Sequence, residues 1–357
     1  MVRYLHFMPI DSPVFNGVLI DLINEHVPDA LTEHLFLLAG EKNIRELGSR
    51  YPNIERTELT REAFLKAAKR GEHLILHSLF LSFHDIRHIP GRIFERITWC
   101  VWGHDLYGFP RPGNLIERWK FRRAIRKIRK IEAVAIGFKY DEIEIRRIFG
   151  NRLPIRSALY SSGYYKEDID RIVASVPTEP KEERLDIMIG HCAFPDFHHC
   201  RHLDNLARFR DKNIRIHLFL SYGQEHYRDE VIAHARRLFA DEQLVIETDM
   251  LSWADYIARL AKIDIAILDF ERQAAFGNII LLAYLRRKMY LSSTGIMARA
   301  LRSEGIPVYD CNRIGEISFE EFGSPVPSYP LEQFVEPLLD KQHIIDQWKR
   351  LFQEIGR

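Results

Sequence analysis

The chain has 357 residues, of which 46% are hydrophobic and 28% are charged, and its formal net charge at pH 7 is +1. This composition is typical of a globular protein and excludes a disordered chain, and the small net charge argues against a protein that binds nucleic acid over its whole surface. The length exceeds what one ordinary core needs and suits two domains.

The first part of the chain alternates apolar runs with segments of helical periodicity. Strands are predicted at RYLHFM, EHLFLLAG, HLILHS, ITWCVWG and EAVAIG, and helices at segments such as TREAFLKAAKR, where Thr60 is the expected N-cap. Continuous apolar strands that alternate with helices indicate a parallel sheet covered on both faces. Residues 1–160 are therefore predicted to form a doubly wound, Rossmann-like α/β domain.

Residues 161–184 are polar and contain two prolines, so we predict that they link two domains. The alternation resumes over residues 185–330, with strands at LDIMIG, IRIHLFL, QLVIET, DIAILDF and KMYLS, and predicts a second doubly wound domain. Residues 331–357 are expected to form a C-terminal helix that packs back on the first domain. Ligands of such sheets bind beyond the carboxyl ends of the strands, and two facing domains would place the site in their cleft.

Polar residues and glycines follow several predicted strands, and their order along the chain resembles a known family. VWGHDLY is similar to the W-G-(A/G)-D-L-Y signature of the TDP-N-acetylfucosamine:lipid II N-acetylfucosaminyltransferases, glycosyltransferase family 56. LHSLF resembles the family's H-G-x-F strand end and keeps His77, and LSYG resembles its short motif in the second domain. DFERQAAFGNIILLAYL is similar to its F-x-R-Q-Q-x-x-G segment, and it keeps Phe270, Arg272, Gln273 and Gly277.

Some positions depart from the family pattern. His104 stands where the family has a small residue, Ala274 replaces a glutamine, and IGHCAFPDFHH matches a G-N-S-G-D-like loop only at Gly190 and Asp196. The resemblance implies a GT-B fold, inversion at the anomeric carbon, and no metal or other cofactor. It also implies a TDP-sugar donor and a polyprenyl-pyrophosphate-linked acceptor at the cytoplasmic membrane face. The altered donor loop admits a UDP-sugar as well.

A metal-independent transferase must stabilise the departing nucleoside diphosphate with positive charge and N–H donors. Gly277 precedes an apolar helix whose free N–H groups would face the phosphates, while Arg272 would pair with them. The further candidates for nucleotide-sugar binding are Gln273, Asn278, Gly190, His191, Ser221, Tyr222 and Gly223. The alternatives are a plain N-cap at Asn278 beside a surface arginine, and an ordinary strand-to-helix turn at residues 221–223.

An inverting transfer needs a general base that deprotonates the acceptor hydroxyl, and in GT-B enzymes the N-terminal domain supplies it. Four residues past predicted strand ends are candidates, in the order Asp105, His104, Asp11 and His77. Asp105 matches the family motif, and His104 could assist or replace it, because an imidazole is the side chain most often used for proton transfer near neutral pH. The alternative is that Gly103 only bends the chain and Asp105 caps a following helix.

Residues 111–132 concentrate nine Lys and Arg against two Glu, with an apolar side formed by Leu115, Trp119, Ile125 and Ile128. A basic amphipathic helix suits an anionic lipid surface, and no motif supports nucleic acid instead. The residues predicted to hold the membrane and the lipid pyrophosphate are Arg118, Lys120, Arg122, Arg123, Arg126 and Lys127. The alternative is a solvated helix face.

Residues 191–202 contain four histidines and two cysteines, so a zinc site with His198, His202, Cys192 and Cys200 is conceivable. No tight C-x-x-C pair supports it, and we expect no metal. The cysteines show no disulfide-framework spacing, the start MVRYLHFMPID lacks a signal-peptide pattern, and no run of 18 apolar residues exists. A cytoplasmic protein, peripheral on the inner face of the membrane, is therefore expected.

Together these features predict a glycosyltransferase of surface polysaccharide biosynthesis that moves an amino- or deoxysugar, similar to N-acetylfucosamine, to a lipid-linked saccharide. Two alternatives remain open from the residues alone. A nucleotide-sugar 2-epimerase shares the two-domain architecture but needs no basic membrane helix. A non-catalytic binding protein could retain the fold without the reaction.

Overall fold

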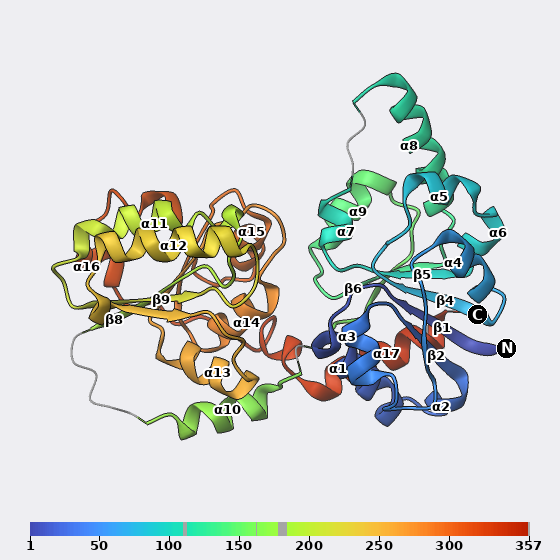
Figure 1. The fold of residues 1–357 in the computed structure, drawn as a ribbon, viewed down its shortest axis with the longest axis horizontal. Helices are drawn as coiled ribbons and strands as arrows, with labels where there is room; N and C mark the ends of the chain where they lie inside the picture. The colour runs from blue at the N-terminus through green and yellow to red at the C-terminus, as the bar shows by residue number, and fades with distance from the viewer. Residues whose placement is uncertain (110–112, 162, 178–183, 356–357) are drawn as a thin grey trace. The chain divides into compact units, whose positions relative to one another are not determined.

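The computed structural model of the chain describes residues 1–109, 113–161, 163–177 and 184–355 (Figure 1). The chain forms two compact units. Unit 1 combines Met1–Gly163 with Asp340–Arg357, and unit 2 is the continuous segment Tyr164–Leu339. Each unit is described by itself below.

Unit 1 is built on a parallel sheet, in which the described residues form seven strands in the order β3-β2-β1-β4-β5-β6-β7. The strands are β1 (Val2–Met8), β2 (His34–Leu38), β3 (Ile54–Arg56), β4 (Gly71–His77), β5 (Ile97–Cys100), β6 (Ala133–Ile136) and β7 (Ile155–Ser157). Apolar side chains on both faces of the central strands are buried, as expected for a parallel sheet covered by helices.

The helices of unit 1 follow the strands in alternation. They are α1 (Pro13–His26), α2 (Ala30–Glu33), α3 (Glu41–Leu47), α4 (Arg61–Ala67), α5 (Phe83–His88), α6 (Gly91–Phe94), α7 (His104–Tyr107), α8 (Leu115–Ile128), α9 (Asp141–Phe149) and α17 (Lys341–Glu354). Helices α1 and α17 lie on one face of the sheet and α5, α8 and α9 on the other (Figure 1). Thr60 caps α4 as predicted, because its hydroxyl accepts the Ala63 N–H.

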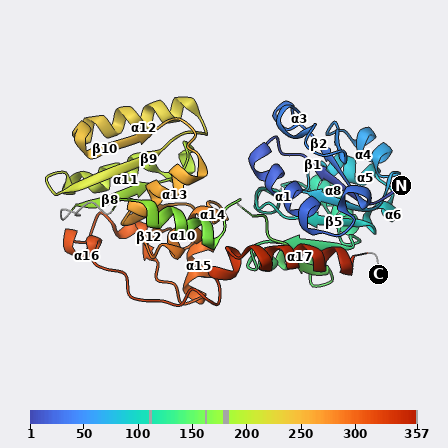
Figure 2. The ribbon, with the colours of Figure 1, turned by 90° about the horizontal axis from the view of Figure 1, so that it is seen from below.

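Helix α17 is bound to unit 1 by hydrogen bonds between residues that are far apart in the sequence. The Trp348 indole donates to the Leu159 carbonyl at 2.9 Å, and the Tyr4 hydroxyl donates to the Phe352 carbonyl at 2.6 Å. Trp348 is fully buried. The last described helix thus completes the covering of the first sheet (Figure 2).

Unit 2 also holds a parallel sheet, with six strands among the described residues in the order β10-β9-β8-β11-β12-β13. The strands are β8 (Leu185–Ile189), β9 (Ile214–Phe219), β10 (Leu244–Glu247), β11 (Ile265–Leu268), β12 (Lys288–Leu291) and β13 (Tyr309–Asp310). The helices are α10 (Lys166–Ser175), α11 (His199–Leu206), α12 (Glu225–Leu238), α13 (Trp253–Lys262), α14 (Phe276–Tyr284), α15 (Ile296–Ser303) and α16 (Phe319–Gly323). Helices α11 and α12 lie on one face of the sheet and α13 on the other (Figure 1).

The predicted connection over residues 161–184 differs from the structure. Most of its first half forms α10, which belongs to unit 2 and packs against α13. Its apolar residues recur with helical spacing around the buried Ile169, and Asp168 accepts the Tyr165 N–H at the helix start. The polar composition hid this amphipathic pattern. Residues 162 and 178–183 of the predicted connection lie outside the described residues.

Three histidines form a hydrogen-bonded chain inside unit 1. His6 on β1 lies 2.9 Å from His77 on β4 through Nδ1, and 2.9 Å from His34 on β2 through Nε2. All three are buried, and rings of Phe352 and Trp348 pack against the ends of the chain. Burial lowers the pKa of His34 and of His77 to about 3 and lowers the pKa of His6 well below 6.5. The three imidazoles are therefore neutral in the folded protein near neutral pH.

This chain predicts a loss of stability in acid. Below pH 6.5 the unfolded histidines bind protons while the folded ones stay neutral, so the free energy of unfolding decreases as the pH falls toward about 3. Each histidine contributes up to about 1.4 kcal/mol per pH unit. We expect His34→Gln to lower this pH slope by the equivalent of about one proton between roughly pH 5.5 and 4.5, measured by urea unfolding. An unchanged slope would mean that His34 takes up its proton within the folded protein.

Candidate functional site

The order of strands in unit 2 reverses between β8 and β11, and the chain leaves these two neighbouring strands in opposite directions. Such a reversal opens a crevice at the carboxyl edge of a parallel sheet, where ligands bind. The loop after β8 carries Asp196, and the loop after β11 carries Arg272. The Nε and Nη2 atoms of Arg272 lie 3.0 and 2.7 Å from Oδ2 of Asp196. This ion pair therefore joins the two loops across the crevice.

Helix α14 begins beside this ion pair. Its N-cap, Ala275, adopts a left-handed conformation with φ of 52°, so the predicted alternative of an N-cap at Asn278 is wrong. Instead, Asn278 accepts a hydrogen bond from the Tyr256 hydroxyl at 3.1 Å. Among the described residues we find no acceptor for the backbone N–H groups of Gly277 and Asn278, as is usual in the first turn of a helix. A Cβ atom at Gly277 would meet nothing within 4 Å, so the space beside this turn is open to a ligand.

Two further residues that were predicted to bind the nucleotide-sugar follow β8. Gly190 has φ of 63°, and a Cβ atom there would lie 2.1 Å from Nε2 of the buried His199, so both backbone and space require glycine. The next residue, His191, is half-buried. Burial, followed by the neighbouring charge of Arg272, lowers the pKa of His191 to about 4. Its imidazole is thus a neutral hydrogen-bonding group beside a guanidinium.

The loop after β9 is paired with the loop after β8. The Ala193 N–H donates to the Tyr222 carbonyl at 2.7 Å, and the Gln224 N–H donates to the Ala193 carbonyl at 2.8 Å. Gly223 has φ of 122°, and its position against the Ala193 carbonyl leaves no room for a side chain. The alternative prediction, an ordinary strand-to-helix turn at residues 221–223, therefore explains why residue 223 is a glycine. Ser221 remains half-buried and Tyr222 exposed next to the crevice loops, and Gln273 is half-buried beside Arg272.

Asp269 lies directly after β11 and joins side chains of α11 to the end of this strand. Its carboxylate accepts hydrogen bonds from Arg201 and from Nε2 of His202, the latter at 3.0 Å. Burial alone would raise the pKa of Asp269. The hydrogen bond from His202 and the charge interaction with that imidazole outweigh the effect of burial, so the pKa of Asp269 is lowered. His202 groups with Asp269 and Cys311, whose ligand atoms lie within 4.8 Å of one another, instead of with the predicted partners His198, Cys192 and Cys200. Because Arg201 already neutralises the carboxylate, we assign this cluster a structural role.

In unit 1 the strand order reverses between β1 and β4, and the candidate bases lie near this edge. Asp105 accepts hydrogen bonds from the Trp99 indole at 2.6 Å, the Leu79 N–H at 2.8 Å and the Trp102 N–H at 3.0 Å. It therefore ties the loops after β4 and β5 together. It does not cap α7, whose N-cap is Gly103.

The other three candidate bases differ in their surroundings. Asp11 accepts the N–H of Asn43 at 2.8 Å and so caps the first turn of α3. His77 lies within β4 and is buried in the histidine chain, so it does not line an accessible site, contrary to the prediction. His104 begins α7, is exposed, and has no side-chain hydrogen bond to any described residue. Of the four, His104 offers the most accessible unengaged side chain.

Helix α8 carries the predicted membrane residues, and its two halves differ. Ile125 and Ile128, predicted to face lipid, are buried in the core of unit 1 instead. Lys127 is half-buried and is engaged within unit 1, because its ammonium donates to the Arg87 carbonyl at 2.7 Å and the Ile89 carbonyl at 2.5 Å. The remaining predicted cations are exposed, namely Arg118, Lys120, Arg122, Arg123 and Arg126.

The N-terminal half of α8 extends away from the body of unit 1 (Figure 1). Trp119 there is 51% exposed, with the Arg123 guanidinium 4.9 Å from the centre of its ring. Arg111 and the side chain of Leu115, both in the predicted basic segment, lie outside the described residues. Every described helix is too short or too polar to cross a bilayer.

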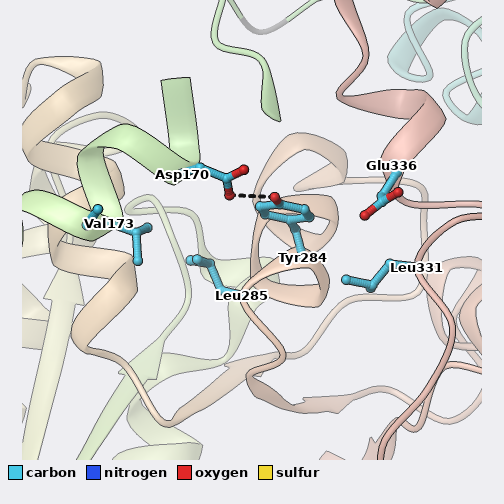
Figure 3. Close-up of a pocket in the computed structure, with 7 residues that line it drawn as sticks. Asp170, Val173, Tyr284, Leu285, Leu331 and Glu336 are labelled. Atoms are coloured by element: carbon cyan, nitrogen blue, oxygen red, sulfur yellow. Dashed lines mark hydrogen bonds between the residues drawn. The ribbon is translucent and has the colours of Figure 1, made fainter. Parts of the chain in front are cut away.

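A surface hollow of about 390 Å³ lies elsewhere in unit 2 (Figure 3). It is lined by Asp170, Val173, Ala174, Tyr284, Leu285, Leu331 and Glu336. Tyr284 ends α14 and donates to Asp170 at 2.5 Å, so the hollow lies at the opposite end of that helix from Gly277, about 10 Å away along the helix axis. Two carboxylates also give it the wrong charge for a diphosphate. It is therefore not the donor site.

Comparison with known families decides between the alternatives. Residues 1–320 match the family described as 4-alpha-L-fucosyltransferase, glycosyl transferase group 56. The chain belongs to this family. It is therefore a glycosyltransferase, as the ordered motifs predicted, and the match favours a transferase over an epimerase or a non-catalytic binding protein.

Solved structures show the same fold at low sequence identity. A glycosyltransferase from Rickettsia africae is 11% identical with a TM-score of 0.68, over 99% of this chain and 98% of that one. Anabaena HepE, solved in complex with UDP and glucose, is 11% identical with a TM-score of 0.66, over 99% of this chain and 100% of that one. The N-terminal domain of Candida albicans trehalose-6-phosphate phosphatase is 12% identical with a TM-score of 0.61, over 100% and 97%. The predicted GT-B fold is thus confirmed.

Three residues at the crevice of unit 2 were not identified from the sequence. Asp269 follows an apolar strand directly, which is the same signal that identified Asp105 in the first domain. His199, beneath Gly190, was noted only as part of a histidine-rich segment. Tyr256, which holds Asn278, gives no sequence signal, because an isolated tyrosine in an amphipathic helix is ordinarily a packing residue.

Proposed function

We propose that this protein transfers an amino- or deoxysugar, similar to N-acetylfucosamine, from a TDP- or UDP-sugar to a polyprenyl-pyrophosphate-linked saccharide. The transfer inverts the anomeric carbon, needs no metal, and serves surface polysaccharide biosynthesis at the inner face of the membrane. The observation that carries the proposal is the edge of unit 2 at the strand reversal, where the guanidinium of Arg272 and the open first turn of α14 come from the loop after β11. The UDP bound in Anabaena HepE, which shares the fold, supports a nucleotide donor.

The donor diphosphate is held without a metal by charge and by N–H groups. Arg272 pairs with the phosphate oxygens, and the Gly277 and Asn278 N–H groups at the positive end of α14 donate to them. His191 stays neutral beside Arg272 and can donate or accept a hydrogen bond without adding charge. These groups stabilise the negative charge that develops as the glycosidic bond to the diphosphate breaks.

His104 is our proposed general base. Proton transfer from the acceptor hydroxyl needs a group that can approach it within hydrogen-bond distance, and the exposed imidazole of His104 meets this requirement. Asp105 already accepts three hydrogen bonds, from Trp99, Leu79 and Trp102, and it is half-buried, so its carboxylate is less available to an acceptor than the imidazole of His104. We therefore assign Asp105 a positioning role, because it fixes the loop that presents His104.

The exposed half of α8 is our proposed contact with the membrane that carries the acceptor. Its cations would lie against anionic head groups, and Trp119 would enter the interface as aromatic rings do in interfacial helices. The buried half of the helix, from Ala124 to Ile128, anchors this arm to unit 1.

The donor site is tested by Arg272→Ala. Losing a charge-assisted hydrogen bond costs about 1.5–3 kcal/mol, so we expect binding of UDP or TDP to weaken by roughly 10- to 150-fold, while uridine or thymidine binding is unchanged. Isothermal titration calorimetry measures both. Arg70→Ala, which removes another half-exposed arginine from an ion pair with Glu55, is the matched control and should change neither. Equal losses for nucleotide and nucleoside would remove Arg272 from the phosphate site.

The assignment of the base is tested by His104→Gln and Asp105→Asn. We expect His104→Gln to lower turnover by about 10²- to 10⁴-fold and to leave UDP or TDP affinity unchanged. Asp105→Asn should instead lower the free energy of unfolding by about 1–3 kcal/mol, because an amide cannot serve every donor that the carboxylate accepts. Turnover is read as release of the nucleoside diphosphate from TDP- and UDP-linked amino- and deoxysugars. An active His104→Gln beside a folded, nucleotide-binding but inactive Asp105→Asn would make Asp105 the base.

Membrane attachment is tested with two matched pairs of adjacent arginines. Each cation near an anionic surface contributes about 1 kcal/mol, so replacing Arg122 and Arg123 by Gln should weaken binding to phosphatidylserine vesicles by roughly 30-fold at low salt. Replacing the exposed Arg236 and Arg237 on α12 should leave binding unchanged. Vesicle co-sedimentation at low and high salt gives the result. Equal losses in both double variants, or no binding by the wild type, would make α8 a solvated helix.

A further inference from the structure

The guanidinium of Arg272 is paired with a carboxylate oxygen of this chain. Both Nε and Nη2 converge on Oδ2 of Asp196, at 3.0 and 2.7 Å. A phosphate oxygen is recognised by the same two N–H groups, so the carboxylate occupies the contact that a donor phosphate would make. The pair and the diphosphate therefore exclude each other at these two N–H groups.

Asp196 is presented from an anchored turn. It lies in a short 3₁₀ turn, Pro195–Phe197, and the ring of Phe197 is buried against Phe270 at 5.3 Å and His191 at 4.7 Å between ring centres. The backbone of Asp196 is thereby held beside the loop that carries Arg272. Its carboxylate can turn away by side-chain rotation while remaining close enough to re-form the pair.

The pair is weak enough to be displaced. The two side chains are 46% and 45% exposed, and ion pairs between solvated groups contribute only about 0.2–1 kcal/mol. A diphosphate carries more charge than a carboxylate and gains the N–H groups of α14 in addition. The nucleotide therefore displaces the Asp196 carboxylate from Arg272, but it binds less tightly than it would to an unpaired arginine.

We propose that Asp196 is a displaceable counter-ion of Arg272, which leaves the arginine when the donor diphosphate binds and returns when the nucleoside diphosphate departs. This inference rests on the proposed nucleotide site. The carboxylate keeps Arg272 oriented toward the crevice in the free enzyme, and it lowers the affinity for the product. Release of product limits turnover in many enzymes, so a built-in competitor for the product's phosphate favours the next cycle.

The test uses the full-length protein and compares Asp196→Asn, Arg272→Ala and the double variant by titration calorimetry with UDP, TDP, uridine and thymidine. We expect Asp196→Asn to bind the preferred nucleoside diphosphate about 1.4- to fivefold more tightly, the range given by the strength of an exposed pair, with nucleoside binding unchanged. In the Arg272→Ala background the same substitution should have no effect. Glu55→Gln, which breaks the equally exposed Arg70–Glu55 pair, should leave nucleotide binding unchanged.

Each contrary outcome identifies what has failed. Weaker nucleotide binding by Asp196→Asn would show that the carboxylate supports the site and would overturn the competition. A gain that persists in the Arg272→Ala background would reduce the effect to simple charge repulsion and also overturn it. If no protein in the set binds UDP or TDP, the proposed nucleotide site fails, and the counter-ion proposal fails with it. Unchanged affinity in Asp196→Asn, with Arg272→Ala still weakened, would reject the counter-ion proposal alone.

Discussion

The reversal of strand order in each parallel sheet is the constraint on which the rest of the structure depends. All strands of a parallel sheet end at one edge, and the neighbours at the reversal send their loops to opposite faces. In unit 2 this places the loops after β8 and β11 on either side of a crevice, with the first turn of α14 directed at it. The charges and N–H groups suited to a diphosphate are brought together by topology, although 80 residues separate Gly190 from Phe270 in sequence.

Loops at such an edge also need partners for their own backbone groups, because the strand ladder has ended. Carboxylates meet this need in unit 1, and a carboxylate in unit 2 joins side chains instead. Asp105 and Asp11 accept backbone N–H groups in unit 1, and Asp269 holds the side chains of Arg201 and His202 in unit 2. A carboxylate after an apolar strand therefore has two possible roles, and its hydrogen-bond partners determine which one it serves. By this criterion Asp196, whose one side-chain partner among the described residues is a half-exposed arginine, is available for exchange.

The apolar periodicity was sufficient to predict two parallel sheets, and the ordered motifs were sufficient to predict the family and the GT-B fold. Prediction failed where burial is decided by tertiary packing. Ile125, Ile128 and Lys127 share the basic segment with Arg122 and Arg123. The C-terminal half of α8 packs on unit 1, so the two isoleucines belong to the core and Lys127 is half-buried. His77 resembled a strand-end base, but the register of β4 places it inside the protein beside His6. Sequence spacing contains no information on either contact.

The return of α17 to the first sheet has a consequence for how the protein forms. Tyr4 bonds to Phe352 across 348 positions of the sequence, whereas unit 2 is one continuous segment. A ribosome must therefore synthesise all of unit 2 before unit 1 can obtain its last helix, and contacts at such separations form slowly because a long loop must first close. During synthesis unit 2 can fold as soon as it emerges, while the part of the first sheet that α17 covers stays exposed. Unit 1 is thus the last part of the chain to complete its fold. Its apolar strands stay exposed for the longest time and are therefore the segments most available to a chaperone.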